Sequence, residues 1–176
     1  MTAPTTAQRF LRDATGADHE RVDALYSRFD LADRASYAAF LQTQARALFA
    51  LEAALTGFPG LPAWRARSPL IAQDLADMDL PLPDPAPIAA LPDDAAAHGT
   101  LYVLEGSRLG GSILAKHVGA DLPTAFIAAS HQPGELRALL GTIADAAELG
   151  GETWRASAIG GAKAAFDVYA RASAKT

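Results

Sequence analysis

Apolar residues recur every three or four positions through most of this 176-residue chain, a spacing typical of amphipathic helices. Half of the residues are hydrophobic, and alanine, the strongest helix former, is the most frequent of them. A strand-like alternation occurs only near residues 100–105, and one strand cannot form a sheet. We therefore expect an all-α fold, with residues 1–176 forming one multi-helix domain.

Turn residues and prolines divide the predicted helices. Thr5 or Thr6 is a suitable cap for the first helix, and Asp93 or Asp94 for the glycine-rich central segment. Five prolines between Pro81 and Pro92 predict an extended connector, because proline removes a helix hydrogen bond. The first predicted helix runs from its cap to about residue 29. The helical spacing predicts further helices at about residues 36–55, 69–78, 95–118, 133–149 and 152–172.

Composition excludes several classes of protein. The net charge is −5 with both signs interspersed, so we expect no nucleic-acid partner. The absence of cysteine excludes disulfides, cysteine-ligated zinc, iron–sulfur clusters and thiol catalysis. The N-terminal residues lack the apolar core of a signal peptide, and no stretch has the length of a membrane span. We expect a cytoplasmic location without membrane association.

His19 lies on the apolar stripe of the first predicted helix. Leu11, Thr15, Val22 and Tyr26 share its face at helical spacing, so we expect the imidazole to point toward the interior. A neutral imidazole in such a place is a suitable axial ligand for haem iron. The alternative is a core histidine that is hydrogen-bonded to a carbonyl group.

Arg12 lies two helical turns before His19 on nearly the same face, about 10 Å away along the axis. A cation at that distance could meet a carboxylate at the edge of a large planar cofactor. The alternative is an ordinary solvated arginine.

Glycines form a stripe in the central segment. Gly99, Gly106 and Gly110 are spaced seven and four residues apart, and Gly111 adds a second consecutive glycine. Each glycine within a helix costs about 1 kcal/mol relative to alanine, so the stripe requires an explanation. One explanation is a close approach of backbone to a flat ligand, with freedom to kink. The other is tight packing of one helix on another.

A strand, phosphate-binding loop and helix are a third possibility for this segment. The glycine spacing matches neither the dinucleotide-binding nor the P-loop pattern, and the chain offers no partner strands. The sequence also excludes the nucleophile elbow of serine hydrolases, because Ser107 is not flanked by glycines at the spacing that this motif requires.

Three segments together resemble the heme oxygenase family. LRDATGADHERVD resembles the proximal helix of that family, and GTLYVLEGSRLGG resembles its distal helix, especially in the bacterial form associated with bacteriophytochromes. IGGAKAAFDVY is similar to the last helix of the family. The resemblance covers residues 10–29 and 97–118 well, and residues 133–170 more weakly.

The resemblance assigns roles to individual residues. His19 matches the proximal iron ligand, and Arg12 and Arg137 match basic residues that face the haem propionates. Phe166 matches an aromatic residue of the pocket wall. Ser107 stands where many members carry an aspartate that anchors water near bound oxygen. The distal glycines that let the helix cross close to haem correspond to Gly106, Gly110 and Gly111.

The resemblance implies that the protein binds haem (iron protoporphyrin IX) as both substrate and cofactor. The haem would lie between the first helix and a kinked, glycine-rich distal helix. The resemblance also implies oxidative cleavage to biliverdin, ferrous iron and carbon monoxide, using oxygen and electrons from a reductase or ferredoxin. A non-enzymatic haem binder or sensor with the same fold is one alternative. A helical scaffold without haem is another, with His19 in the core and His98, His117 and His131 on the surface.

Overall fold

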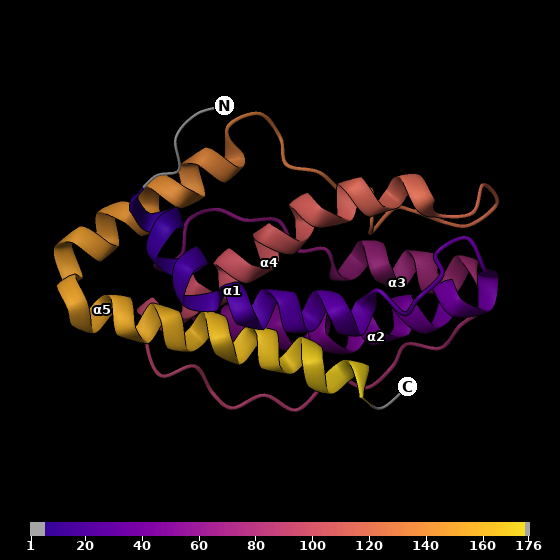
Figure 1. Ribbon diagram of the computed structural model, residues 1–176, viewed down its shortest axis with the longest axis horizontal. Coiled ribbons are helices and arrows are strands. Elements are labelled where there is room, and N and C mark those ends of the chain that lie inside the picture. Colours follow the sequence, from indigo (N-terminus) through magenta and orange to yellow (C-terminus); the bar gives the residue numbers. More distant parts are fainter. Residues whose placement is uncertain (1–5, 175–176) are drawn as a thin grey trace.

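The computed structural model describes residues 6–174, and within them every regular element is helical. Thr5 lies outside the described residues, and Thr6 is the first residue of α1. The predicted all-α class is confirmed, and residues 100–105 lie inside α4, so a strand there is wrong. The elements shown in Figure 1 are α1 (Thr6–Tyr26), α2 (Arg34–Leu55), α3 (Ser68–Asp77), α4 (Asp94–Leu114), the 3-10 turn η1 (Ala115–His117) and α5 (Glu135–Ser173).

Two of the helices begin at aspartate caps. The Asp33 side chain accepts a hydrogen bond from the backbone N–H of Ser36 at the start of α2, over 2.8 Å. Asp93 does the same for the N–H of Ala96 at the start of α4, over 2.9 Å. These bonds satisfy backbone donors that the first helical turn leaves without partners.

Backbones of α4 and α5 meet where the two helices cross. A Cβ atom added to Gly99 would lie 1.8 Å from the carbonyl oxygen of Ala158. A Cβ atom on Gly161 would lie 2.0 Å from the carbonyl oxygen of Ala96. No side chain fits at either position, so these two glycines permit the crossing. For Gly99, tight helix packing is therefore the correct explanation.

α5 consists of two helical segments joined at Gly151, which has φ 62° and ψ −149°. The bend lies at the left of Figure 1, between the orange and yellow parts of this helix. Two helices over residues 133–149 and 152–172 were predicted, and the break falls between them. α4, by contrast, continues as one α-helix through Gly106, Gly110 and Gly111. The non-helical glycine therefore lies in α5 and not in the glycine-rich helix.

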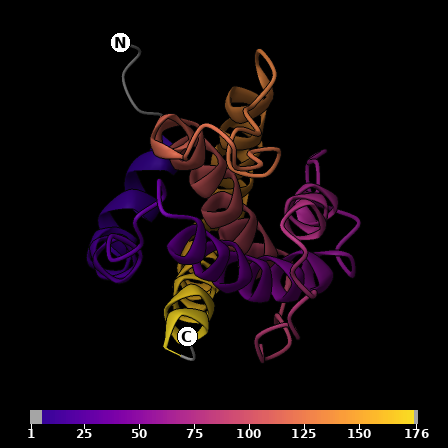
Figure 2. The same cartoon turned by 90° about the vertical axis from the view of Figure 1, so that its right-hand side faces the viewer.

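The core lies around α2, whose Tyr37, Leu48 and Leu51 are fully buried. α1 and α4 pack on different parts of α5, and Figure 2 shows α1 and α4 side by side with a space between their axes. Among the described residues, no helix combines the length and apolar character that crossing a bilayer requires.

Candidate functional site

A cavity of about 550 Å³ opens between α1 and α4, with further walls from α2 and α5. Its size falls in the range of pockets that bind organic ligands. Tyr102, Phe126 and Phe166 give part of its wall an aromatic character. The sequence-predicted site residues that line it are Arg12, His19, Gly106, Ser107, Gly110, Gly111 and Phe166.

His19 borders this cavity instead of lying in the packed interior. Its side chain is 63% exposed, so the expectation of an inward-pointing imidazole was wrong. Leu11 and Thr15, earlier on the same stripe, are buried, but the open cavity begins before the stripe reaches His19. The ring meets that of Phe166 edge to face, with centroids 6.0 Å apart.

The His19 ring is oriented by a carboxylate on the next helical turn. Nδ1 lies 3.1 Å from Oδ2 of Asp23. This contact leaves Nε2 as the nitrogen available to a metal, and a carboxylate partner of this kind holds the tautomer of a ligating histidine. Among the described residues, no three potential metal-ligating side chains come together. His19 is therefore suited to a metal that brings its other ligands with it, as a porphyrin does.

Gly106 and Gly110 expose bare backbone to the cavity. A Cβ atom added to either glycine would meet no described atom within 4 Å. At Gly111, it would lie 3.0 Å from the carbonyl oxygen of Ile127, so this glycine also admits a neighbouring loop. The stripe thus has two functions in succession, helix packing at Gly99 and an open cavity wall at Gly106 and Gly110.

Arg67 reaches the same wall from the segment before α3 and is 2% exposed. Its Nη2 atom donates hydrogen bonds to Ser107 Oγ over 2.6 Å and to the carbonyl oxygen of Leu104 over 2.8 Å. Sequence reasoning missed this residue, because no local pattern connects it with Ser107, 40 positions later. It also missed Tyr169, which its spacing from Phe166, three residues apart on α5, could have revealed.

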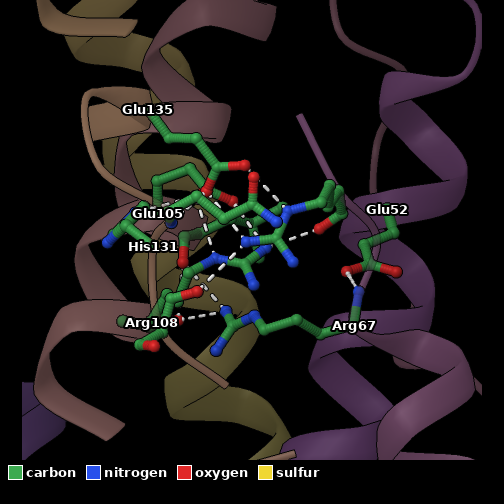
Figure 3. A network of polar contacts seen from close by, with 11 residues as sticks. Glu52, Arg67, Glu105, Arg108, His131 and Glu135 are labelled. Atoms are coloured by element: carbon green, nitrogen blue, oxygen red, sulfur yellow. Dashed lines mark hydrogen bonds and ion pairs between the residues drawn. The ribbon is translucent and has the colours of Figure 1, made fainter. Parts of the chain in front are cut away.

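Two carboxylates hold this region in place (Figure 3). Glu52 accepts the backbone N–H of Arg67 over 2.7 Å and that of Ser68 over 3.0 Å, which secures the start of α3. Glu105 accepts two hydrogen bonds from Arg108, over 2.9 and 3.1 Å. Both carboxylates are buried, so each is satisfied inside the protein and not by solvent.

Arg137 is exposed on α5 and is not among the residues lining the cavity. Leu136 and Leu140, one helical turn apart, line it instead, and the neighbouring position projects to another side of the helix. The geometry therefore gives no support to a ligand-facing Arg137.

The other histidines differ partly from expectation. His98 is buried, with Nδ1 2.7 Å from the carbonyl oxygen of Asp94. His131 is 11% exposed, and its Nε2 lies 2.9 Å from Oε2 of Glu105. Placing these two residues on the surface was wrong, whereas His117 is exposed. The alternative of a scaffold without haem has His19 in the core and the other three histidines outside, and only His117 lies where that alternative places it.

These features define a class: an all-helical protein with one histidine facing a cavity that can hold a flat organic ligand. No family model matches the chain. It is 35% identical over 132 residues to heme oxygenase PigA of Pseudomonas aeruginosa, an alignment spanning 67% of this chain and 66% of that protein. It is also similar to the heme oxygenase of Neisseria meningitidis, solved in NO- and CO-bound forms. That likeness has a TM-score of 0.77 and 25% identity, and it covers 98% of this chain and 92% of the other. The chain belongs to the heme oxygenase family.

Proposed function

We propose that this protein is a heme oxygenase that binds haem in the cavity between α1 and α4. It would cleave haem to biliverdin, ferrous iron and carbon monoxide, using oxygen and electrons from a reductase or ferredoxin. One observation supports this proposal above the others. The cavity is lined on one side by His19, which contacts Asp23, and on the other by the bare backbone of Gly106 and Gly110. A cytoplasmic location and a single domain over residues 1–176 stay predictions.

In this proposal, His19 Nε2 binds the iron and Asp23 orients the imidazole. Haem itself supplies the redox-active iron and the macrocycle that is attacked. His19 would hold the iron from the α1 side of the cavity, and the iron would supply the site at which oxygen binds. The edge-to-face contact with Phe166 limits rotation of the imidazole.

Gly106 and Gly110 would let haem lie close to the α4 backbone. Because no side chain projects from either position, the ligand plane can approach the helix more closely than it could at alanine. A helix backbone this close to bound haem would limit the space in which oxygen can lie and would favour attack at the porphyrin edge. Ser107, on the same wall, would hold a water molecule that delivers protons.

Arg12 is the exposed cation at the cavity that suits a haem propionate. An ion pair in such an exposed place contributes about 0.2–1 kcal/mol, so Arg12→Ala should weaken haem binding modestly. The variant should also let haem rotate in the cavity and change the biliverdin isomer. Unchanged haem affinity together with an identical isomer would contradict this role.

Aerobic haem titration followed by reduction tests the proposed function directly. We expect one haem per chain with a histidine-ligated Soret spectrum, and biliverdin after a reductase or ascorbate is added. His19→Ala should lose the axial-ligand spectrum, and added imidazole should restore it. A wild-type protein that binds haem without forming biliverdin would be a non-enzymatic haem binder. A wild-type protein that binds no haem would be neither a heme oxygenase nor a haem binder.

A further inference from the structure

One part of the cavity wall comes from the chain between η1 and α5 and not from a helix. Phe126 and Ile127 lie in this segment, and both are buried and line the cavity. Figure 1 shows the segment leaving the end of α4 and returning past α3. We call residues 123–128 the wall turn. Because no regular element fixes the wall turn, its contacts with other helices determine where this end of the cavity closes.

Asp74 of α3 makes two of these contacts. Its Oδ1 accepts the backbone N–H of Ala125 over 3.0 Å, and its Oδ2 accepts that of Phe126 over 2.8 Å. Both oxygens of one carboxylate are thus used on consecutive residues of the wall turn. The Tyr37 hydroxyl, on α2, donates to the carbonyl oxygen of Pro123 over 2.8 Å. Side chains of two different helices therefore hold the wall turn.

Asp74 is a costly residue to use for this purpose. Its side chain is fully buried, and within residues 6–174 no basic side chain lies at ion-pair distance from it. Burial raises the pKa of its carboxyl group, and the hydrogen bonds from Phe126 and Ala125 only partly oppose this effect. A buried charge destabilises a fold unless other groups satisfy it. The carboxylate therefore depends on the wall turn as much as the turn depends on the carboxylate.

The cavity has two chemically different ends along α4. Near one end, burial raises the pKa of the Tyr102 hydroxyl and the positive charge of exposed Arg12 opposes this, so the two side chains lie near each other. Gly111 lies about 13 Å further along the helix axis, and a Cβ atom there would lie 3.0 Å from the carbonyl oxygen of Ile127. The second end is thus closed by the wall turn, with buried Phe126 and Ile127.

Haem has a matching polarity, because both propionates project from one edge and the other edges carry apolar methyl and vinyl groups. A haem whose propionates meet Arg12 would turn an apolar edge toward the wall turn. We propose that Asp74 is a positioning residue that fixes the wall turn against this apolar edge and thereby selects one orientation of haem in the cavity. This inference rests on the proposed function, because it takes haem as the ligand.

Asp74→Asn tests whether the carboxylate holds the wall turn. Asparagine has nearly the same shape but offers one acceptor oxygen, and its NH2 group would face a backbone N–H. In the haem-free protein, the amide of Ala125 or Phe126 should exchange about tenfold faster or more, because a hydrogen bond to a charged group is lost. NMR measures this exchange. Asp77→Asn, on the same helix with Gln73 as its partner, is the matched control.

The orientation of bound haem is the second readout, and it does not require turnover. Haem methyl resonances of the ferric cyanide complex distinguish one orientation from another by NMR. Asp74→Asn should raise the share of a second orientation, and during turnover it should form a biliverdin isomer that wild type does not form. Asp77→Asn should match wild type in both. A role in stability alone would lower the melting temperature and leave the haem orientation unchanged.

Two further variants leave the buried carboxylate in place. Tyr37→Phe removes only the hydrogen bond to Pro123, so it should raise the second orientation less than Asp74→Asn does. Ile127→Val removes one methyl group from the wall and keeps both attachments, so it should change the haem orientation with normal exchange of the Phe126 amide. These variants decide the question if Asp74→Asn does not fold.

The results that would overturn the inference differ from those that would overturn the proposed function. Unchanged exchange of both amides in Asp74→Asn would show that the carboxylate does not hold the wall turn. Faster exchange with an unchanged haem orientation would show that the turn does not select it, as would unchanged orientation in both Tyr37→Phe and Ile127→Val. In these cases wild type still binds and cleaves haem. A wild-type protein that binds no haem would overturn both proposals.

Discussion

Nδ1 of His19 lies 3.1 Å from Oδ2 of Asp23, one turn further along α1. The two side chains come from the same helix, so their contact does not depend on how the rest of the protein packs. A ligand histidine oriented in this way is held in one tautomer before haem arrives.

Asp23→Asn should weaken the bond between His19 and haem iron. A neutral amide is a poorer acceptor for the imidazole N–H, so the ligand becomes less basic, and losses of about 10–100-fold in affinity or activity are typical. Resonance Raman spectra of the ferrous complex should show a lower iron–histidine stretching frequency. Asp18→Asn, which alters an aspartate paired with Arg21 on the same helix, is the control and should leave that frequency unchanged.

Glycines of the α4 stripe should respond to alanine with opposite signs. Gly99→Ala should destabilise the haem-free protein by at least about 1–3 kcal/mol, because its Cβ atom would meet the backbone of α5. Gly106→Ala should stabilise it by up to about 1 kcal/mol, because its Cβ atom faces open space and alanine favours helix. Urea denaturation measures both changes. Equal effects at the two positions would contradict the division of the stripe.

Gly110→Leu should separate haem binding from haem cleavage. The longer side chain would project into the cavity from α4, and a Cβ atom at this position meets no described atom within 4 Å, so the protein should fold and keep its proximal ligand but lose biliverdin formation. Ser107→Ala should slow turnover and leave haem affinity nearly unchanged. Single-turnover assays with spectroscopic detection of biliverdin check both variants. Normal rates in both would show that these residues only shape the helix.

Glu135 predicts a loss of stability in acid. Hydrogen bonds from Arg65 and, second, from the backbone of Gln132 lower the pKa of the Glu135 carboxyl from 4.5 to about 2. Because the folded pKa lies below the unfolded one, the carboxylate stabilises the fold fully above pH 4.5 and loses this effect as pH falls toward 2.

Glu135→Gln should therefore be less stable than wild type at neutral pH, with the difference shrinking between pH 4.5 and 2. Urea denaturation over that range measures it. Glu148→Gln, at an exposed position of the same helix, is the control. A stability difference that does not vary with pH would show that the Arg65–Glu135 pair contributes nothing through its charge.

Local patterns predict much of this fold because helix formation depends on neighbours in sequence. Spacing of apolar residues places the helices, and Asp93 is recognisable as a cap. The interruption of the last helix is visible in Gly150 and Gly151. Cavity residues that share a helical stripe, such as Gly106 and Gly110, are found in the same way.

Features that depend on tertiary contacts could not be predicted in this way. Gly99 and Gly106 lie on one stripe, and only the position of α5 distinguishes a packed glycine from an open one. The exposure of His19 depends on the cavity that opens between α1 and α4. Arg67 meets Ser107 only because the segment before α3 crosses α4.

The break at Gly151 means that α5 reaches the cavity twice. Leu136 and Leu140 line it from one segment, and Phe166 and Tyr169 line it from the other. The two segments are joined at a residue whose φ of 62° suits glycine. A ligand that contacts both segments of α5 would therefore restrict their motion relative to each other at Gly151. Slowed hydrogen exchange in residues 135–150 would then report that the cavity is filled, although most of that segment never touches what fills it.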